Sequence, residues 1–494
     1  MSSLRESAWQ TTKTFAWLFA ALAMVALLSQ PGATHDEWFH AQSIWCGQGE
    51  RSPYCASQRP HPSESNFKVA RSNIVATNCQ VNLESPVLCP VEQQMYSTNI
   101  TNNGRLYPSG FYFVLSWLVV PSVELSIALV RVVSALLITV VFALMTWLLP
   151  PRHRLVLFLV CLTTFMVTGL FLFASVNPSS WTTFGIGVGW LGIHAALTSS
   201  DISRRRKLAL LAVGFVAWSM ALGSRSDSAA FLAVVIALIA IHLAHLHAPK
   251  APMKIGGALA VMATVVALAL ETVTPHRPSA YIARLFSFEN GEPDNVTFFT
   301  HYAIQGLPNV LRSLGTVPTM GRVLIPDLVY VLGVAVFAAC IGVTVDRRSR
   351  LQIVGALLII ASITLVIMVH VAEIDNRDSF GVEPRYSYPL LLVLVGWWCL
   401  LGPPDLYERT SRYLRLFAAV AVTMFSLTMF SVAERFIDRS TFGLRYLPEG
   451  PDQWWWSWLP VGPNVVVILA PIFLWRFFIE MRTLIEQDDH ELIA

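Results

Sequence analysis

A short segment near the N-terminus carries the residue types of acid–base chemistry. Asp36 and Glu37 are adjacent and His40 follows shortly after, directly behind an apolar stretch. In a helix, Asp36 and His40 would share a face. Adjacent carboxylates at a membrane surface are costly unless they are solvated, paired or bound to a metal. We interpret the segment as a general base or a metal-binding acid, with a solvated helix end as the alternative.

Three arginines lie in or beside apolar stretches, where a charge needs a specific reason. Arg131 lies within one stretch. Arg225 forms a short turn with Asp227, and Arg385 stands between two prolines beside Tyr386. A guanidinium that is fixed at a membrane surface suits bidentate phosphate binding. The alternatives are snorkelling for Arg131, mutual neutralisation of Arg225 and Asp227, and an interfacial anchor at Arg385.

Other polar residues gather where apolar stretches end. An Arg-Leu-Tyr-Pro run leads into an aromatic stretch, an Asn-Pro pair makes a turn, and a glutamate precedes the late arginine. Ordinary loops and turns also contain such residues. We assign to the rim of a substrate cavity Arg105, Tyr107, Asn177, Asp227 and Glu383.

The composition defines the kind of protein that positions these residues. The chain has 494 residues, of which 54% are hydrophobic and 13% charged. Soluble domains carry about 25% charged residues. This excludes a soluble multi-domain enzyme, a nucleic-acid binder and a disordered scaffold. A net charge of +3 is too small to indicate an anionic partner. The composition therefore predicts a polytopic membrane protein.

The predicted fold is an all-α transmembrane helical bundle of about twelve spans, because a hydrocarbon core takes roughly 20 apolar residues per helix. A shorter apolar stretch, 110–121, is interpreted as a re-entrant or interfacial helix. The predicted spans cover residues 13–30, 124–149, 155–174, 181–198, 208–223, 227–247, 255–273, 327–345, 351–372, 386–402, 414–432 and 461–479.

Lysine and arginine in the short loops set the predicted orientation. Short loops on one side hold 14 basic residues and those on the other hold 3. We expect cytoplasmic termini and one domain over 1–480, followed by a cytoplasmic tail at 481–494. Three large loops at 31–123, 274–326 and 433–460 are expected on the outer face, together with the candidate residues. A cleaved signal peptide is the alternative for the first stretch.

Seven cysteines divide into two groups. An even set that is confined to one outer loop predicts two disulfides, and a zinc site is the alternative. Of the three possible pairings, 46–55 with 79–89 closes the shortest loops, but the sequence does not choose between them. The four disulfide candidates are Cys46, Cys55, Cys79 and Cys89, while Cys161, Cys340 and Cys399 lie in predicted spans.

The order of these motifs forms a pattern. An Asp-Glu pair with a nearby His follows the first span, a Pro-x-Gly-x-Tyr run enters the interfacial helix, and an Arg lies in the next span. A Ser-x-Asn-Pro turn and a late Pro-Arg-Tyr-x-x-Pro motif come after. Over most of its length the chain thus resembles a family of bacterial multi-pass membrane proteins of formerly unknown function within the GT-C glycosyltransferase superfamily.

Two positions depart from that family's pattern. The family's late motif usually reads Gln-Gly-Arg-Tyr, whereas here Glu383 and Pro384 replace the first pair. The opening Asp-Glu is usually preceded by Pro, and here His35 takes that place. These departures concern the donor more than the fold.

The resemblance implies an inverting enzyme of the bacterial inner membrane with its active site on the outer face. Such enzymes move a sugar from a polyprenyl-phosphate donor to a cell-envelope glycan, lipid or protein. Asp36 would be the general base, while Glu37 and His40 would orient it or help Asp36 bind a divalent cation (Mg, Mn or Ca). The donor phosphate would meet Arg385 first, then Arg225 and Arg131, beside Tyr386, because positive charge is needed where negative charge develops.

Three other classes remain open. A transporter or flippase of lipid-linked sugars often shows internal repeats and ionisable residues at the midplane, whereas here the polar residues gather at the outer ends. A non-catalytic partner in envelope assembly would use the cysteine-bearing loop for docking. A membrane acyltransferase would need a histidine-centred site deep in the bundle.

Overall fold

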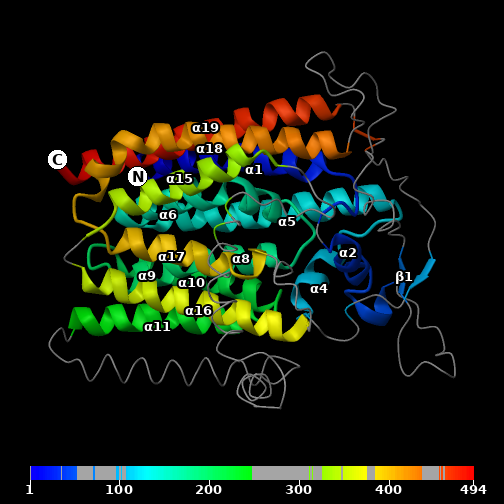
Figure 1. Cartoon of the computed structure of the whole chain (residues 1–494), viewed down its shortest axis with the longest axis horizontal. Coiled ribbons are helices and arrows are strands. Elements are labelled where there is room, and N and C mark those ends of the chain that lie inside the picture. The colour runs from blue at the N-terminus through cyan, green and yellow to red at the C-terminus, as the bar shows by residue number, and fades with distance from the viewer. Residues whose placement is uncertain are drawn as a thin grey trace, which may run out of the picture.

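A computed structural model gives the arrangement of the chain. The residues that it describes are 2–34, 36–52, 70–72, 96–98, 102, 107–247, 311, 314, 325–346, 349–374, 384–436, 456, 458–459 and 462–493. Within them the chain is a bundle of helices that lie side by side along the longest axis of the molecule (Figure 1).

Five described helices are long and apolar enough to cross a membrane. A sixth span results if α6 (Pro151–Thr164) and α7 (Leu170–Phe173), which flank the π-helical turn Phe165–Gly169, are counted as one bent unit. The five are α1 (Ser2–Leu28), α5 (Val123–Leu148), α11 (Ser228–His247), α18 (Leu406–Phe436) and α19 (Pro463–Ile493).

The remaining helices do not meet this test of length and hydropathy over their described residues. They are α2 (Glu37–Trp45), α4 (Gly110–Ser116), α8 (Ser179–Gly187), α9 (Gly189–Thr198), α10 (Arg204–Leu222), α15 (Asp327–Val343), α16 (Arg350–Ile374) and α17 (Tyr388–Leu400), with 3₁₀ turns at Gly49–Arg51 and Pro384–Tyr386. Every predicted span except 255–273, which lies outside the described residues, overlaps a helix. The count of twelve is not confirmed, because five or six described units meet the length and hydropathy of a span.

Two predicted spans are wrong in detail: 155–174 is the bent α6–α7 unit described above, and 181–198 is also divided. Residues 181–198 form two helices, α8 and α9, which meet at Val188. The break lies in a glycine-rich stretch that packs closely on α10: a Cβ on Gly185 would lie 2.2 Å from the carbonyl oxygen of Ala217. Close packing of the backbones therefore accounts for glycine at this position.

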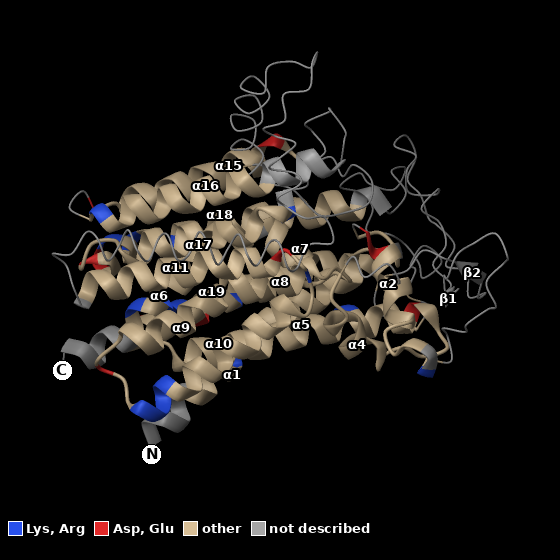
Figure 2. Cartoon of the chain, turned by 90° about the horizontal axis from the view of Figure 1, so that it is seen from below, with Lys and Arg blue, Asp and Glu red and all other residues tan. Residues whose placement is uncertain are grey.

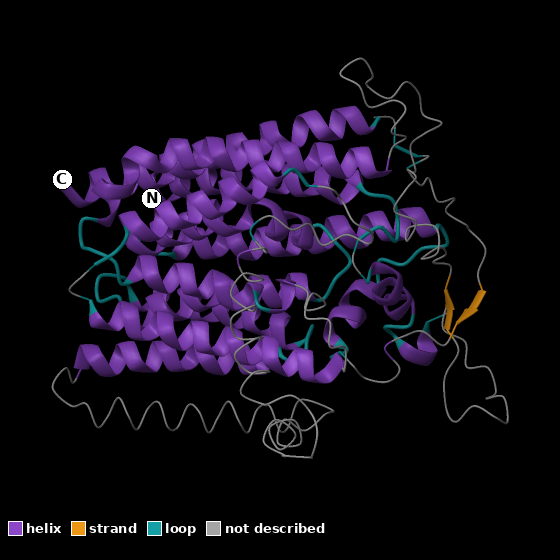
Figure 3. Cartoon of the chain, in the orientation of Figure 1, coloured by secondary structure: helices purple, strands orange, loops and turns teal. Residues whose placement is uncertain are grey.

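The expectation of an all-α fold needs one addition. Two short strands, β1 (Ala70–Ser72) and β2 (Tyr96–Thr98), pair antiparallel within the first large loop. Figure 3 shows them in orange at one end of the bundle, beyond the helices. Much of the loops 31–123, 274–326 and 433–460 lies outside the described residues.

The first and last helices, α1 and α19, pack antiparallel against each other. The ring of Phe15 lies 5.6 Å from that of Phe477, and Trp17 stacks on Phe473 at the same distance. Lys13 Nζ lies 2.7 Å from Glu480 in α19. Both chain ends therefore lie at the same end of the bundle (Figure 1). α19 continues to Ile493, so the predicted tail after residue 480 extends the last helix.

Arginines near that end of the bundle bind the carbonyl groups that helices leave unsatisfied at their C-termini. Arg152 donates to the carbonyls of Leu400 and Gly402 just after α17. Arg154 and Arg206 both donate to the carbonyl of Leu149, which ends α5. Many of the Lys and Arg residues lie toward the end that holds the N- and C-termini, while the body of the bundle has few charges (Figure 2).

Candidate active site

The candidate site begins where α1 passes into α2. Asp36 is the N-cap residue of α2 and has φ 56 and ψ 11. Among the described residues it is the one non-glycine with positive φ. Aspartate is one of the few residue types that enter this left-handed region readily. Within one turn of chain the Asp36 and Glu37 carboxylates reach different arginines, Arg385 and Arg131.

Glu37 is completely buried and forms a two-bond ion pair with Arg131. Arg131 Nε lies 2.7 Å from Oε1, and Nη2 lies 2.5 Å from Oε2. Oε2 also accepts the backbone N–H groups of Gly32, at 2.9 Å, and Thr34, at 3.3 Å. The carboxylate therefore fixes the turn that precedes Asp36.

The other N–H groups of Arg131 donate hydrogen bonds to backbone carbonyls at the end of α1. Its Nη1 donates to the carbonyls of Ala26, at 2.8 Å, and Ser29, at 2.7 Å, and Nη2 donates to that of Gln30, at 2.9 Å. Together with the two bonds to Glu37, these occupy the five N–H groups of a guanidinium. The geometry thus argues against the prediction that Arg131 binds a phosphate and gives it a structural role.

Asp36 has a more open environment. Its Oδ2 lies 2.6 Å from Arg385 Nη2, and the Asp36 side chain is 31% exposed while that of Arg385 is 4% exposed. Arg385 lies in the 3₁₀ turn Pro384–Tyr386 just before α17. Pro389 stands in the first turn of α17, where no backbone N–H is needed, and so fixes the start of this helix.

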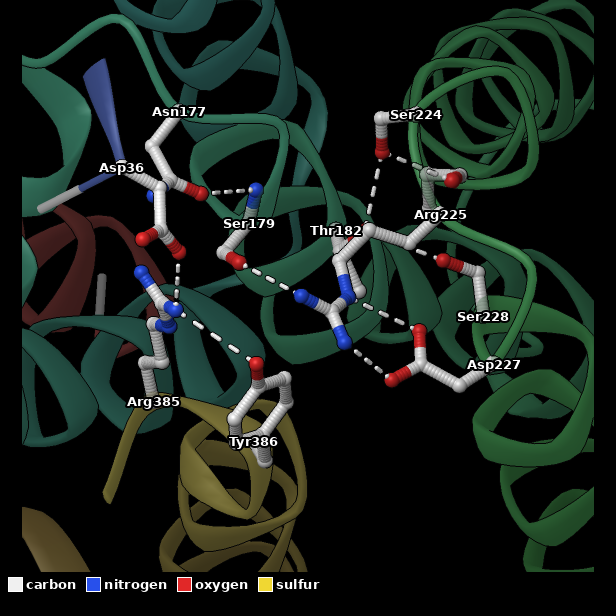
Figure 4. A network of polar contacts seen from close by, with 11 residues as sticks. Asp36, Asn177, Ser179, Thr182, Ser224, Arg225, Asp227, Ser228, Arg385 and Tyr386 are labelled. Atoms are coloured by element: carbon white, nitrogen blue, oxygen red, sulfur yellow. Dashed lines mark hydrogen bonds and ion pairs between the residues drawn. The ribbon is translucent and has the colours of Figure 1, made fainter. Parts of the chain in front are cut away.

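A second ion pair lies on the other side of Tyr386. Arg225, in the turn between α10 and α11, donates to both oxygens of Asp227, at 2.9 and 2.6 Å, and to the hydroxyl of Ser179, at 3.0 Å. The Arg225 guanidinium lies 4.7 Å from the centre of the Tyr386 ring and that of Arg385 lies 5.2 Å from it. Both distances suit cation–π contacts, so Tyr386 links the two arginines (Figure 4).

The charge of Arg225 is secured by Asp227. Burial alone would lower the pKa of Arg225, but the carboxylate of Asp227 and its hydrogen bonds raise it overall. Arg225 thus keeps its positive charge in a nearly enclosed position.

Asn177 and several hydroxyls support Arg225 from α8. The side-chain oxygen of Asn177 accepts the Ser179 N–H at 2.9 Å and so shapes the turn that presents the Ser179 hydroxyl. Behind it, the Thr182 hydroxyl contacts those of Ser224, at 2.8 Å, and Ser228, at 3.0 Å (Figure 4). The hydroxyls of Ser179, Ser224 and Ser228 lie in the two turns that the sequence singled out, but were not assigned to the site. Thr182 was missed, although a run of Ser and Thr inside an apolar region was its signal.

His40 belongs to an aromatic cluster next to Asp36. Its Nδ1 lies 2.9 Å from the hydroxyl of Tyr112, and its ring meets Tyr107 edge-on at 5.1 Å. The backbone N–H of Phe111 donates to the Gly223 carbonyl at 2.8 Å, which holds α4 against the end of α10. Tyr107 accordingly lies 5.9 Å from the Arg225 guanidinium.

The two tyrosines of this cluster stay protonated over a wide pH range. Burial raises the pKa of Tyr107, although Arg225 opposes the shift. Burial also raises the pKa of Tyr112 well above its usual value. Both phenols therefore remain available as hydrogen-bond donors beside Asp36. Tyr112 was absent from the predicted site, and its contact with His40 is what places it there.

Several predicted residues cannot be placed. Arg105, Glu383 and three of the four cysteines (Cys55, Cys79 and Cys89) lie outside the described residues. Cys46 follows the last residue of α2. The two predicted disulfides and their connectivity therefore remain predictions.

The predicted metal pair, Asp36 and Glu37, does not converge. Each carboxylate is directed to its own arginine. In the part of the chain that the structure describes, no group of three or more His, Cys, Asp or Glu side chains could hold a metal ion. The adjacent pair is therefore not a joint ligand set, and a need for a divalent cation remains a prediction.

The long apolar helices and the buried charge pairs define a membrane protein with a polar site at one end of its bundle. Residues 19–394 match the model of a family described as predicted membrane proteins (DUF2142), and the chain belongs to this family. The match runs from α1 into α17 and so includes Asp36, Arg225 and Arg385. No curated protein and no solved structure matches the chain.

Proposed function

We propose that this protein is a GT-C type glycosyltransferase of the bacterial inner membrane. It would move a sugar from a polyprenyl-phosphate donor to a cell-envelope glycan, lipid or protein on the outer face. The observation that carries the proposal is the 2.6 Å contact between Asp36 and Arg385, which lie 349 positions apart in the chain. A carboxylate and a guanidinium at one membrane-side site are the two groups that transfer from a lipid phosphate requires.

In this proposal each group has one task. The acceptor hydroxyl gives its proton to Asp36, and its oxygen attacks the anomeric carbon of the donor sugar. The bond from that carbon to the phosphate oxygen breaks, and the lipid phosphate leaves with the electron pair. Arg385 stabilises the charge that develops on this phosphate. Attack from the face opposite the leaving group inverts the anomeric carbon.

Neighbouring residues support these tasks. Arg225 adds a second positive charge across the ring of Tyr386. The Glu37–Arg131 pair holds the turn that presents Asp36. His40 is buried one helical turn after Asp36, where it contacts Tyr112 and Tyr107, and an acceptor sugar that approaches Asp36 would meet this aromatic cluster.

The experiment that tests the proposal is a donor panel. Purified full-length protein in detergent micelles is incubated with polyprenyl-phosphate sugars and candidate envelope acceptors, and mass spectrometry measures released polyprenyl phosphate and glycosylated product. We expect one donor to be consumed, with an inverted anomeric configuration in the product. Asp405→Asn is a matched control, because Asp405 pairs with Arg409 on the exposed surface, remote from the site. Translocation of intact donor across vesicles without sugar transfer would support the flippase instead.

A further inference from the structure

The three carboxylate–arginine pairs of the candidate site differ in how deeply they are buried. Glu37 and Arg131 are both fully buried and share two bonds. Asp227 and Arg225 also share two bonds, with the Asp227 side chain 18% exposed. The remaining pair has a 2.6 Å contact between Asp36 Oδ2 and Arg385 Nη2, and its carboxylate is the most exposed of the three.

The closed Asp36–Arg385 pair conflicts with both tasks of the proposed reaction. The Asp36 carboxylate already binds the Arg385 guanidinium at 2.6 Å, so one of its oxygens is engaged where the acceptor proton would have to go. The guanidinium is in turn occupied where it would receive a phosphate. Neither group can act until the other is replaced.

We propose that the Asp36–Arg385 pair is an exchange latch, in which the phosphate of the donor displaces Asp36 from Arg385 and thereby releases the base. This inference rests on the proposed function and adds an order of binding to it: donor first, acceptor activation second. Without a bound phosphate the Asp36 carboxylate stays paired with Arg385, so an acceptor that binds first is not activated.

Arg385 should bind the donor phosphate more strongly than it binds the Asp36 carboxylate. A phosphate group offers more oxygens and more charge than a carboxylate, and arginine binds it with two parallel N–H bonds. Arg385 would not need to move, because the Tyr386 ring packs against its guanidinium at 5.2 Å. The carboxylate is the partner that leaves, since Asp36 stands at a loop-to-helix junction and is partly exposed.

Arg225 serves as an internal contrast. Its guanidinium is held by both oxygens of Asp227 and by the hydroxyl of Ser179. Exchange there would break three bonds to this chain. Arg225 therefore remains a fixed positive charge, and the latch is confined to Arg385.

The test is equilibrium binding of two probes to the full-length protein in micelles: radiolabelled decaprenyl phosphate and inorganic phosphate. Removing the competing carboxylate with Asp36→Asn should tighten decaprenyl phosphate binding by about tenfold, within the usual range of coupling between ligands. Asp36→Gly is a second variant that also removes the carboxylate. We expect it to fold, because glycine readily adopts a φ of 56. Asp405→Asn should leave binding unchanged.

The outcomes separate the latch from the reaction. Tighter binding in both Asp36 variants supports the latch, even if the donor panel shows no transfer and the proposed function fails. Unchanged or weaker binding in both overturns the latch, even if the wild type transfers sugar. Tightening for both probes assigns the site to the phosphate group itself, and tightening for decaprenyl phosphate alone adds a requirement for the lipid chain.

Discussion

Asp36 and Glu37 are neighbours in the chain, yet each meets its arginine in a different way. Glu37 is sealed from solvent against Arg131, and every donor of that arginine is used within the protein. Asp36 lies 2.6 Å from Arg385 and keeps 31% of its side chain exposed. The contrast shows that adjacent acids can have different environments: Glu37 is buried and holds the backbone turn, while Asp36 is partly exposed.

The largest effect should come from removing the exposed carboxylate. We expect Asp36→Asn to lower the rate of sugar transfer by about 10² to 10⁴, the usual contribution of a general base. The free energy of unfolding should fall by less than for Glu37→Gln, because Asp36 is partly exposed whereas Glu37 is fully buried. Steady-state turnover and thermal unfolding of the same preparation measure both quantities. Wild-type turnover in this variant would remove Asp36 from the mechanism.

The buried carboxylate should show the opposite profile. Glu37→Gln leaves the Arg131 charge buried without its partner, which should cost about 3–5 kcal/mol of stability. Chemical unfolding monitored by tryptophan fluorescence in micelles measures this loss. Asp405→Asn is the control for removal of a carboxylate, and its stability should stay close to wild type because the Asp405–Arg409 pair is exposed to solvent. A Glu37→Gln protein as stable as that control would contradict the structural role.

A smaller effect should come from the backbone at Asp36. Asp36→Gly and Asp36→Ala both remove the carboxylate, but glycine fits a φ of 56 and alanine does not. We expect the glycine variant to be more stable than the alanine variant by about 1 kcal/mol. Both variants lose the ion pair, so the difference between their free energies of unfolding reports the backbone effect alone. Thermal unfolding of the two variants measures this difference. Equal stability would mean that the turn relaxes without cost.

Part of this site could be predicted from the sequence. Charges beside apolar stretches are rare enough that Asp36, Arg225 and Arg385 could be selected as candidates. In the structure both arginines pack on Tyr386, and Asp36 pairs with Arg385. The sequence could not predict that Asp36 and Glu37 pair with different arginines. These pairings depend on a single left-handed residue, and residue type restricts φ at an aspartate only weakly.

For the bundle, too, composition predicted the apolar helices but not the features that depend on three-dimensional contacts. Hydropathy located the apolar helices because lipid selects for apolar residues over a fixed length. It did not show that residues 181–198 break at Val188, because hydropathy does not report where a helix changes direction. It also did not show that Arg131 binds the end of α1, because the partners are backbone carbonyls, which any residue supplies.

The most direct test of the account is the single-turnover rate of sugar transfer by folded Arg385→Gln protein, with the donor identified by the panel. We expect this rate to fall by about 10² to 10³, as when a group that stabilises the transition state is removed, while thermal unfolding stays close to wild type. A folded Arg385→Gln protein that transfers sugar at the wild-type rate would contradict the central claim that Asp36 and Arg385 form the catalytic pair.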